Sequence, residues 1–384
     1  MSEIIFNEQQ DAAIHKVLDW FGKHQRIATP KDWFFLSGYA GTGKTTLAKF
    51  IASECGGMEK VAFIAPTGKA AARLREKGCP YAKTLHQFAY RYIGDDSDED
   101  PMFVSKGSLD EKPKLIILDE ASMVGARAMD TLLGHSIPIL ALGDIGQLPP
   151  VLDSQFFKES NVDVLLDQIE RNAGNIVKAS MFVRQGKRLP IREYDDVAVR
   201  DGEPTDDQLM ALSGEDAVIL CAYNSTRERI NKRLRNLLGH GSKRLPQAGE
   251  KIVCTFNQHT HRLMNGEQAI LLELCEPASH EQEAFHPDAP DDMMMARIKS
   301  LTDGRERRVA FNPLSFDADE NVRKAAQKKH GGFDFGGCLT VHKSQGSEWE
   351  KVGVIEETLR NLPYAQIMYT AFTRAISRLE VYRA

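Results

Sequence analysis

Residues 38–45 constrain the fold of this chain more than any other segment, because they follow the phosphate-binding pattern G-x-x-x-x-G-K-T. The apolar run 33–37 before them is predicted to be a buried strand, and residues 46–53 after them show the apolar spacing of a helix. Glycines let backbone N–H groups crowd around a polyphosphate, and the helix N-terminus adds partial positive charge. The segment therefore predicts a loop, between a strand and a helix, that binds a nucleoside triphosphate.

Within this loop, Lys44 is expected to reach the β- and γ-phosphates, and the Thr45 hydroxyl is expected to face Mg²⁺. The other expected nucleotide contacts come from Gly41, Thr42, Gly43 and Thr46. A chance glycine-rich turn is the alternative, but eight constrained positions between a strand and a helix fit it poorly. The loop alone does not indicate what triphosphate hydrolysis drives.

The composition is that of a soluble globular protein, with 42% hydrophobic and 27% charged residues among 384. That length favours two or more domains. No apolar run approaches the roughly 20 residues needed to span a bilayer, and the polar, acidic N-terminus does not resemble a signal peptide. Six scattered cysteines without a C-x-x-C pair argue against a zinc site or disulfides. They favour reduced thiols in a cytoplasm.

Short apolar, β-branched runs alternate with helical patterns in the first part of the chain. The runs are 60–66, 114–119 and 137–143, and the helical patterns between them include 69–77 and 125–133. This alternation predicts a parallel sheet covered by helices on both faces, with ligands bound at the carboxyl ends of the strands.

A second α/β alternation begins with a predicted strand at 217–221 and a helix at 226–238, after a polar stretch at 183–214 with few apolar repeats. It pauses over residues 271–336, which are rich in charge, Pro and Met. The alternation then resumes with predicted strands at 337–340, 352–355 and 379–382. An α/β unit interrupted in this way indicates a small inserted domain.

Residues 217–262 carry nine Lys and Arg residues against two Glu residues, so they are locally basic in a chain of net charge −5. Such a stretch could follow a phosphate backbone or could form a solvated helix face, and charge alone favours neither.

Further candidates for triphosphate chemistry follow the predicted strands. Asp119, at the tip of an apolar strand, is placed to hold Mg²⁺, and the adjacent Glu120 can accept a proton from the attacking water. Gln147 follows the next strand, where a glutamine can orient water at the γ-phosphate. Arg374 lies far along the chain; an arginine from a second domain could complete a charge clamp when the domains close. For a single arginine, a surface position or an ion pair is the alternative.

Taken in order, these segments and several others resemble the motif series of superfamily 1 helicases. Within that superfamily they resemble the B group, the RecD/Dda-like branch of DNA helicases, over the length of the chain. The matching segments are FNEQQ (6–10), GYAGTGKT (38–45), APTGKAA (65–71), TLH (84–86), DEAS (119–122), GDIGQLPP (143–150), DQIER (167–171), YNSTR (223–227), MNGE (264–267), LTVHKSQG (339–346) and YTAFTRA (369–375). The absence of a large N-terminal extension is expected of a self-standing, Dda-like enzyme.

The resemblance implies an α/β fold with two tandem RecA-like P-loop domains built on parallel sheets. The first would comprise residues 1–86 and 114–165, and the second residues 166–270 and 337–384. A small β-hairpin pin is expected at 87–113, and an SH3-like β insertion at 271–336. In the pin, Phe103 could stack on the junction base pair of a duplex or could belong to a small local core. Neither interpretation is favoured.

The resemblance also implies roles for individual residues. The ATP site would comprise Lys44, Thr45, Asp119, Glu120, Gln147, Arg171 and Arg374, with Gln10 on adenine and Gly346 and Glu348 as further nucleotide contacts. Thr45 and Asp119 would hold Mg²⁺. The residues implied to contact DNA are Thr67, Lys69, Thr84, His86, Phe103, Pro149, Asn224, Asn265, Thr340, His342 and Lys343. Hydroxyl, imidazole and ammonium groups can grip phosphates without reading bases.

The implied function is that of an ATP-dependent DNA helicase and translocase that moves 5′→3′ on single-stranded DNA and uses ATP and Mg²⁺. Expected partners are single-stranded DNA, single/double-strand junctions, and a single-strand-binding protein or replisome component. The chain is expected to be monomeric, with no membrane contact. The alternatives are a translocase or protein-displacing motor that unwinds poorly, an RNA helicase, and a P-loop ATPase switch that controls a protein partner.

Overall fold

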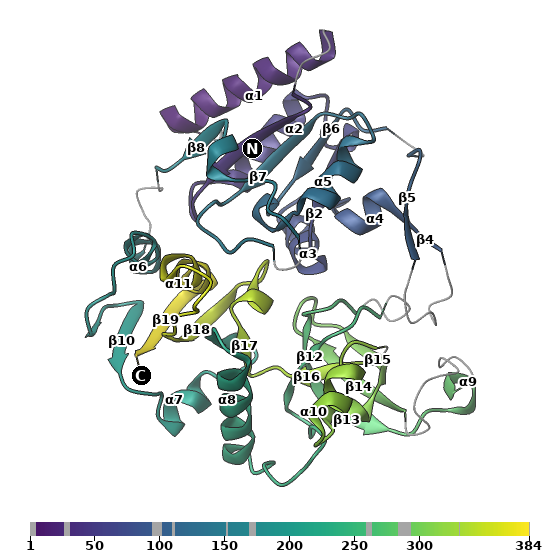
Figure 1. The fold of residues 1–384 in the computed structure, drawn as a ribbon, viewed down its shortest axis with the longest axis vertical. Helices are drawn as coiled ribbons and strands as arrows, with labels where there is room; N and C mark the ends of the chain where they lie inside the picture. Colours follow the sequence, from purple (N-terminus) through teal and green to yellow (C-terminus); the bar gives the residue numbers. More distant parts are fainter. Residues whose placement is uncertain are drawn as a thin grey trace. The chain divides into compact units, whose positions relative to one another are not determined.

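The computed structural model describes residues 5–26, 31–93, 102–109, 112–150, 153–168, 174–258, 263–282, 293–329 and 331–383. These residues form two compact units (Figure 1). The first unit takes in the described parts of Met1–Arg91 and Phe103–Arg184. The second takes in those of Tyr92–Met102 and Gln185–Ala384.

The first unit is built on a six-stranded sheet whose order is β3-β2-β6-β7-β1-β8. Every pair of neighbouring strands in it is parallel. The strands are β1 (Trp33–Gly38), β2 (Val61–Ala65), β3 (Lys83–Thr84), β6 (Leu115–Leu118), β7 (Ile139–Gly143) and β8 (Val164–Leu166). The predicted strands and the parallel sheet are therefore confirmed in this unit.

Helices cover both faces of this sheet, since alternate strand residues enter two different cores. Phe34 and Leu36 of β1 pack in one core, with residues of α1 (Glu8–Arg26), α2 (Lys44–Glu54) and α3 (Gly68–Glu76). Phe35, between them, packs in the other core, with residues of α4 (Leu85–Ala89) and α5 (Ala126–Leu133). Side chains that alternate across a strand produce this two-layer burial. The unit ends with α6 (Asn175–Arg184).

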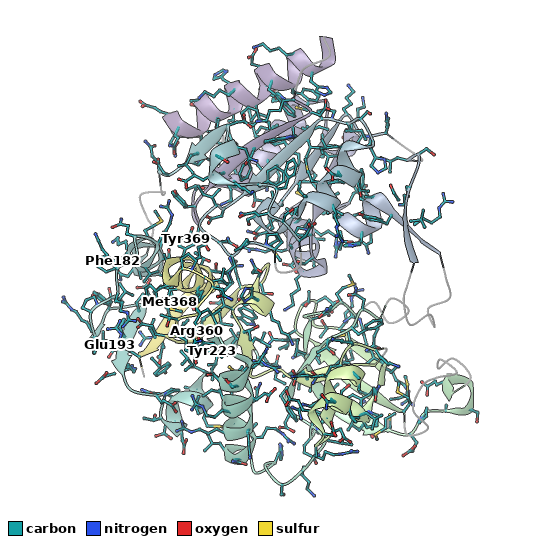
Figure 2. All side chains as sticks on the ribbon, viewed as in Figure 1. Phe182, Glu193, Tyr223, Arg360, Met368 and Tyr369 are labelled. Carbon is teal, nitrogen blue, oxygen red and sulfur yellow. The ribbon has the colours of Figure 1, made fainter. Side chains whose placement is uncertain are left out.

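The second unit contains a six-stranded sheet of order β17-β11-β18-β19-β10-β9. Its strands are parallel except β9, which pairs antiparallel with β10. The strands are β9 (Arg192–Glu193), β10 (Val197–Asp201), β11 (Ala217–Cys221), β17 (Cys338–Thr340), β18 (Trp349–Ile355) and β19 (Ala375–Arg383). The accompanying helices are α7 (Asp206–Ala211), α8 (Asn224–Leu237) and α11 (Tyr364–Phe372). Met368 and Tyr369, labelled in Figure 2, are both buried in α11.

Between β11 and β17 along the chain lies a five-stranded antiparallel sheet of order β15-β14-β13-β12-β16. Its strands are β12 (Lys251–Cys254), β13 (Gln268–Cys275), β14 (Met294–Ser300), β15 (Glu306–Phe311) and β16 (Phe333–Phe335), with short helices α9 (Ser279–Gln282) and α10 (Glu320–Ala326). Phe311 stacks on Phe316 and on Phe333, with 5.5 Å between ring centroids in each pair. An inserted β sheet is therefore present, and its SH3-like character stays a prediction.

Three sequence-based boundaries differ from the observed elements. The insertion expected to begin at residue 271 includes β12 and all of β13, because β12 pairs with both β13 and β16. The domain limit expected between residues 165 and 166 falls inside β8, which pairs with β1 of the first sheet. The polar stretch 183–214, in which no strand was expected, contains β10. Only three apolar residues mark β10, and its parallel partner β19 lies at the far end of the chain.

The expected pin corresponds in position to a two-stranded sheet of β4 (Tyr90–Ile93) and β5 (Met102–Ser105). Phe103 belongs to β5, and its side chain lies outside the described residues. Arg171 also lies outside them. Within the described ranges, no helix is long and apolar enough to cross a bilayer.

Many of the basic side chains in residues 217–262 form ion pairs with carboxylates of the same unit. Arg227, in α8, donates to Asp334 of β16, and both side chains are buried. Arg235 Nε lies 2.8 Å from Glu250 Oε1, also in a buried pair. Outside the core, Arg229 pairs with Glu203 at 2.7 Å. These pairs are more consistent with structural roles than with a continuous phosphate-binding surface.

The Arg227–Asp334 pair links α8 to the five-stranded sheet, and we expect it to matter for stability. Asp334→Asn keeps the side-chain size but leaves the buried Arg227 cation with only the exposed Glu228 carboxylate, 3.4 Å from its Nη2. Removing one partner of a buried pair costs about 3–5 kcal/mol. Urea denaturation followed by circular dichroism should show a clearly lower midpoint.

The control is Arg229→Ala, which breaks the exposed pair with Glu203 and should cost about 0–1 kcal/mol. Equal midpoint shifts in the two variants would contradict a stabilising role for the buried pair.

Candidate nucleotide and nucleic-acid sites

The phosphate-binding loop has the backbone that its glycines predict. Gly41 and Gly43 have φ values of 81° and 77°, in the left-handed region that residues with a Cβ rarely adopt. Gly43 is also the N-cap of α2, where no side chain caps the helix. The first-turn N–H groups of α2 are thus available to an anion, and the helix dipole favours one there.

Side chains from elsewhere in the first unit hold this loop. The buried Gln10 donates from Nε2 to the Thr42 carbonyl at 3.2 Å. Arg184, the last residue of α6, stacks on the Tyr39 ring with 3.5 Å to its centroid, and its guanidinium donates to the Tyr39 hydroxyl. Lys44 Nζ donates to the carbonyls of Gly38 at 2.5 Å and Tyr39 at 3.1 Å. The loop is therefore shaped by contacts from α1 and α6 as well as by its own sequence.

Two carboxylates lie at the carboxyl end of β6. Asp119 Oδ1 accepts a hydrogen bond from the Glu120 backbone N–H at 3.0 Å. Burial, and then the neighbouring Glu120 carboxylate, raise the pKa of the Asp119 carboxyl to about 6. The Lys44 and Arg73 cations act in the opposite direction on the same carboxyl. Lys44, from the loop after β1, is therefore electrostatically coupled to the carboxylate after β6.

Glu120 has a strained backbone. Its φ of 51° and ψ of 40° place a residue with a Cβ in the left-handed helical region. That conformation costs of order 1 kcal/mol or more and is concentrated at functional sites. The strained turn leads directly into Ala121–Met123, a short 3₁₀ helix.

Two buried polar atoms near this edge of the sheet have no hydrogen-bond partner among the described residues. They are Ser122 Oγ, after β6, and Gln147 Oε1, after β7. A buried polar group without a partner is costly and marks a place where a ligand can supply one. Together with the uncapped α2 and Lys44, they fit a magnesium–triphosphate group, for which Thr45 and Asp119 carry the oxygen ligands that Mg²⁺ prefers.

Two other strands of this sheet, β2 and β3, are each followed by a helix whose first turn is capped by a threonine. Thr67 Oγ1 accepts from Ala70 N at 3.2 Å and caps α3, after β2. Thr84 caps α4, after β3, in a reciprocal capping box with Gln87. His86 stacks on Tyr90 at 5.3 Å, and burial lowers the pKa of its imidazole. Each cap hydroxyl accepts from the helix and keeps its O–H available to donate. Lys69 lies in the first turn of α3, next to Thr67.

In the second unit, the parallel pairing of β11 with β17 brings several predicted residues to one edge. Cys221 and Thr340 are register partners, so the start of α8 at Asn224 lies near the turn that carries His342 and Lys343. Burial lowers the pKa of the His342 imidazole. The buried Thr340 Oγ1 accepts from Lys343 N at 3.4 Å.

Glu357 caps the amino end of α8. Its carboxylate accepts from Ala222 N at 2.8 Å, Tyr223 N at 3.2 Å and the Thr226 hydroxyl at 2.5 Å. The Tyr223 hydroxyl donates to the Thr358 carbonyl at 2.5 Å. The segment that presents Asn224 is therefore fixed by the loop after β18.

Arg374 is 2% exposed and is held by its own segment. Its guanidinium donates to the Thr370 carbonyl at 3.0 Å, the Ser347 carbonyl at 3.3 Å and the Thr373 hydroxyl at 3.1 Å. Among the described residues, no carboxylate pairs with it. A buried guanidinium with only neutral partners is suited to an anionic ligand. Gly346, with φ of 74°, lies in the turn that leads to Ser347 and Glu348.

Asn265 and Pro149 are the remaining predicted DNA contacts among the described side chains. Asn265 lies in the turn between β12 and β13, where its N–H donates to Asn257 Oδ1 at 2.8 Å. It therefore belongs with the antiparallel sheet and not with the α/β part of the second unit. Pro149 is half-buried in the loop after β7.

Sequence reasoning missed Gln9, Arg73, Arg184 and Glu357. Gln9 accepts from Asp167 N and Gln168 N, at 3.0 Å each, and so ties α1 to the chain after β8. Its neighbour Gln10 was singled out because of its motif, and the same motif could have flagged Gln9. Arg184 and Glu357 act across more than 100 residues on Tyr39 and α8. No local pattern marks them.

Two family models match the chain. One is described as an AAA domain and matches residues 7–199, and the other is described as a UvrD-like helicase C-terminal domain and matches residues 335–382. The first covers half of the chain.

Curated relatives include an ATP-dependent RecD2 DNA helicase from Deinococcus radiodurans, 29% identical over 94% of this chain and 47% of that protein. The ATP-dependent DNA helicase Dda of Enterobacteria phage T4 is 31% identical over 42% of this chain and 40% of that protein. This chain thus spans less than half the length of either.

Solved structures with a similar fold include Pif1 helicase from Bacteroides in complex with ADP-AlF3 and ssDNA. Its TM-score is 0.54 at 18% identity, over 100% of this chain and 93% of that one. Pif1 helicase from Candida albicans gives a TM-score of 0.52 at 18% identity, over 99% and 95% of the two chains. These likenesses confirm the predicted fold class.

The strain at Glu120 predicts the relative stability of two substitutions that both remove its carboxylate. Glu120→Gly should be more stable than Glu120→Ala by roughly 0.5–1 kcal/mol, because only glycine adopts a positive φ without penalty. Denaturation midpoints of the two variants, measured side by side, check this expectation. An Ala variant at least as stable as the Gly variant would show that the turn is unstrained.

Proposed function

We propose that this chain, which belongs to the AAA-domain family and to the RecD/Dda-like branch of the superfamily 1 helicases, is an ATP-driven DNA helicase. Its relatives are named ATP-dependent DNA helicases. The observation that carries the proposal is the convergence of Lys44, Asp119, Glu120 and Gln147 after parallel strands of one sheet. Hydrolysis chemistry needs a phosphate cradle, a metal-binding carboxylate and a base at one edge, and these residues have those chemical properties.

In the proposed ATP site, the α2 N–H groups and Lys44 bind the phosphates, and Gln10 faces the adenine while bracing the loop through Thr42. Thr45 and Asp119 hold Mg²⁺, which when bound neutralises charge on the β- and γ-phosphates. Glu120 takes the proton from the attacking water, and Gln147 orients that water through its unpaired amide oxygen.

We assign Arg374 and Arg171 to charge that develops on the γ-phosphate. Arginine donors aimed at a transferring phosphoryl group stabilise its transition state. Arg374 comes from the second unit, so its engagement would couple the chemistry in the first unit to movement of the second. The buried guanidinium and its neutral hydrogen-bond partners support this role.

The proposed DNA contacts are the cap threonines Thr67 and Thr84, with His86, in the first unit, and Asn224, Thr340 and His342 in the second. Lys69, Pro149, Asn265 and Lys343 extend both sets. These groups bind phosphates and sugars without a base-specific pattern, so binding should be independent of sequence and sensitive to salt. Alternating grip by two units would advance the chain along one strand, and we propose 5′→3′ movement.

The deciding experiment measures ATP hydrolysis without nucleic acid, with single-stranded DNA and with single-stranded RNA, and then unwinding of duplexes with a 5′ or a 3′ tail. Stimulation by DNA and unwinding of the 5′-tailed duplex are expected. Stimulation without unwinding indicates a translocase, and the absence of stimulation indicates an ATPase switch. Equal stimulation by RNA would contradict a preference for DNA.

Lys44→Ala should abolish ATP hydrolysis while single-strand binding remains measurable, because it removes the ammonium proposed to bind the phosphates and none of the proposed DNA contacts. Lys49→Ala is the matched control: it lies on the same helix α2, and its Nζ donates to the Lys77 carbonyl at 3.0 Å. The control should hydrolyse ATP like the parent chain. If Lys44→Ala hydrolyses ATP at the DNA-stimulated rate of the wild-type chain, the proposed ATP site is wrong.

Phe103→Ala tests the wedge role proposed for the β4–β5 sheet. Loss of an aromatic platform at the junction should reduce duplex unwinding more than single-strand-stimulated ATP hydrolysis, since base stacking contributes about 1–3 kcal/mol. Val104→Ala, on the same strand and 41% exposed, is the control. Equal losses in both assays, or no loss, would remove the wedge role.

A further inference from the structure

A cavity of about 890 Å³ lies in the first unit and is separate from the residues assigned to ATP. It is lined by Met58–Val61, which leads into β2, and by the segment 112–114, which leads into β6. Because β2 and β6 are parallel, these segments lie at the amino ends of their strands. The phosphate-binding loop and Asp119 follow the carboxyl ends of strands in the same sheet. The cavity therefore has no role in the ATP site described above.

The lining is strongly basic. Among the described lining residues, five are lysines and one, Glu59, carries a carboxylate; the lysines are Lys60, Lys83, Lys106, Lys112 and Lys114. Lys106 Nζ donates to the Gln87 carbonyl at 2.9 Å. None of the five forms an ion pair with a described carboxylate; Asp110 and Glu111 lie outside the described residues. A cavity lined by charges of one sign focuses a positive potential and raises the local concentration of anions, so this cluster favours an anionic ligand.

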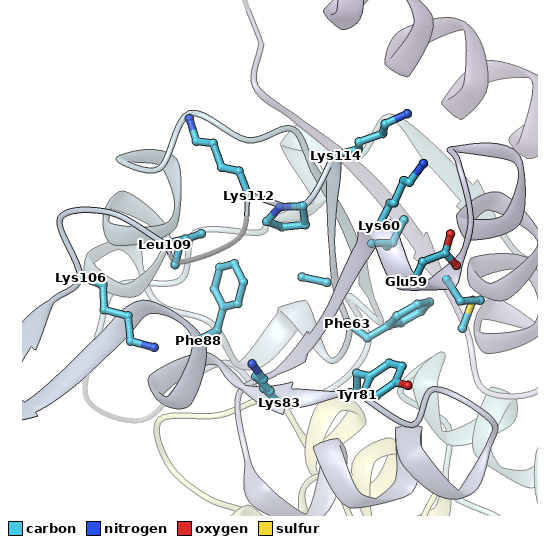
Figure 3. Close-up of a pocket in the computed structure, with 14 residues that line it drawn as sticks. Glu59, Lys60, Phe63, Tyr81, Lys83, Phe88, Lys106, Leu109, Lys112 and Lys114 are labelled. Carbon is cyan, nitrogen blue, oxygen red and sulfur yellow. The ribbon is translucent and has the colours of Figure 1, made fainter.

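Figure 3 shows how the lysines are distributed. Lys83 and Lys106 extend toward the middle of the cavity, near the Phe88 ring, whereas Lys60, Lys112 and Lys114 stand along its upper rim. The five positive charges are thus distributed along the cavity and are not concentrated at one point. An extended polyanion fits this spacing better than a single phosphate does.

The positive charge of the cavity lining affects the pKa of a neighbouring histidine. His135 packs edge-on against Phe88, with 6.1 Å between ring centroids. Burial, followed by the charges of Lys112 and Lys106, lowers the pKa of its imidazole. Two lysines of the cavity lining therefore act on one imidazole, which packs against Phe88 of the same lining.

Tyr81 adds an aromatic platform to the basic lining. Its side chain is 75% exposed, although a large aromatic ring gains most from burial. Phe63 and Leu109 add apolar surface to the same cavity. Lysines that track a backbone beside an aromatic ring on which bases stack are the combination that binds single strands without sequence preference.

We propose that this cavity binds the displaced strand of a DNA fork. The inference rests on the proposed function. Lys83 and Phe88, next to Thr84 and His86, line one side of the cavity. The lining segments 58–60 and 112–114 precede the amino ends of β2 and β6, whereas Thr84 and His86 lie at the carboxyl end of β3 and in α4, which leads into the β4–β5 sheet. If that sheet separates the strands, the translocated strand meets the α4 side. The other strand is captured by the lysines and Tyr81, which hinders re-annealing.

The test compares binding of a fork with two tails and of a duplex with only the 5′ tail, by fluorescence anisotropy without ATP. The wild-type chain should bind the fork more tightly. The triple variant Lys60→Glu, Lys112→Glu, Lys114→Glu changes only rim residues and should reduce the affinity ratio to about one. Its log–log salt slope for the fork should fall by about 2. Tyr81→Ala should weaken fork binding about fivefold or more.

The control triple variant, Lys16→Glu, Lys158→Glu, Lys178→Glu, makes the same charge change at exposed positions of the first unit away from the cavity. It should keep the wild-type affinity ratio, and both triple variants should keep single-strand-stimulated ATP hydrolysis. A wild-type ratio in the cavity variant overturns the proposal. So does a loss of tripolyphosphate binding without a loss of fork preference, which would mark a small-anion site.

A failure of the proposed function gives a different experimental result from a failure of the strand-binding proposal. A wild-type chain without DNA-stimulated hydrolysis refutes the motor, whatever the affinity ratio. Parallel loss of single-strand-stimulated hydrolysis in the cavity variant alone would assign the cavity to the translocated strand and would also overturn the proposal.

Discussion

Parallel strand pairing is the constraint on which the candidate sites depend. In the first unit every strand of the sheet runs in the same direction, so the chain leaves β1, β6 and β7 at one edge. Lys44 and Gln147 are more than 100 residues apart and Asp119 lies between them, yet all three follow these strands. The same rule brings Asn224 and Thr340 together after β11 and β17. A one-strand change of direction would remove a functional residue from its edge.

The proposed ATP site has an energetic cost that can be assigned to a few residues. Glu120 is held in a left-handed conformation, the Asp119 carboxyl has a pKa raised to about 6, and Gln147 Oε1 is buried without a described partner. Each of these features destabilises the folded chain, and a bound cation or polar ligand would relieve the last two. Their concentration after two neighbouring strands is what distinguishes this edge from an ordinary sheet terminus.

Local patterns predicted most of the α/β elements, because buried parallel strands are apolar runs and P-loops have few alternative conformations. The family resemblance and the fold class are confirmed. The elements and contacts that local patterns did not predict depend on residues far away in the sequence. β10 is a strand because β19, at the far end of the chain, supplies its hydrogen bonds, and β12 joins the antiparallel sheet because β16 pairs with it. Arg184 and Glu357 act on Tyr39 and α8 across the same kind of separation, which no single-sequence pattern encodes.

In the proposed function, different helix caps serve the triphosphate and the DNA. At α2 the cap is Gly43, which offers no side chain, so several N–H groups remain for a triphosphate that must be held firmly through hydrolysis. At α3 and α4 the caps are Thr67 and Thr84, whose hydroxyls already accept from the helix and can donate only one further hydrogen bond. A single neutral donor grips a phosphodiester weakly. A motor must release its track at every step, and weak, repeated contacts of this kind allow release where an uncapped helix end would not.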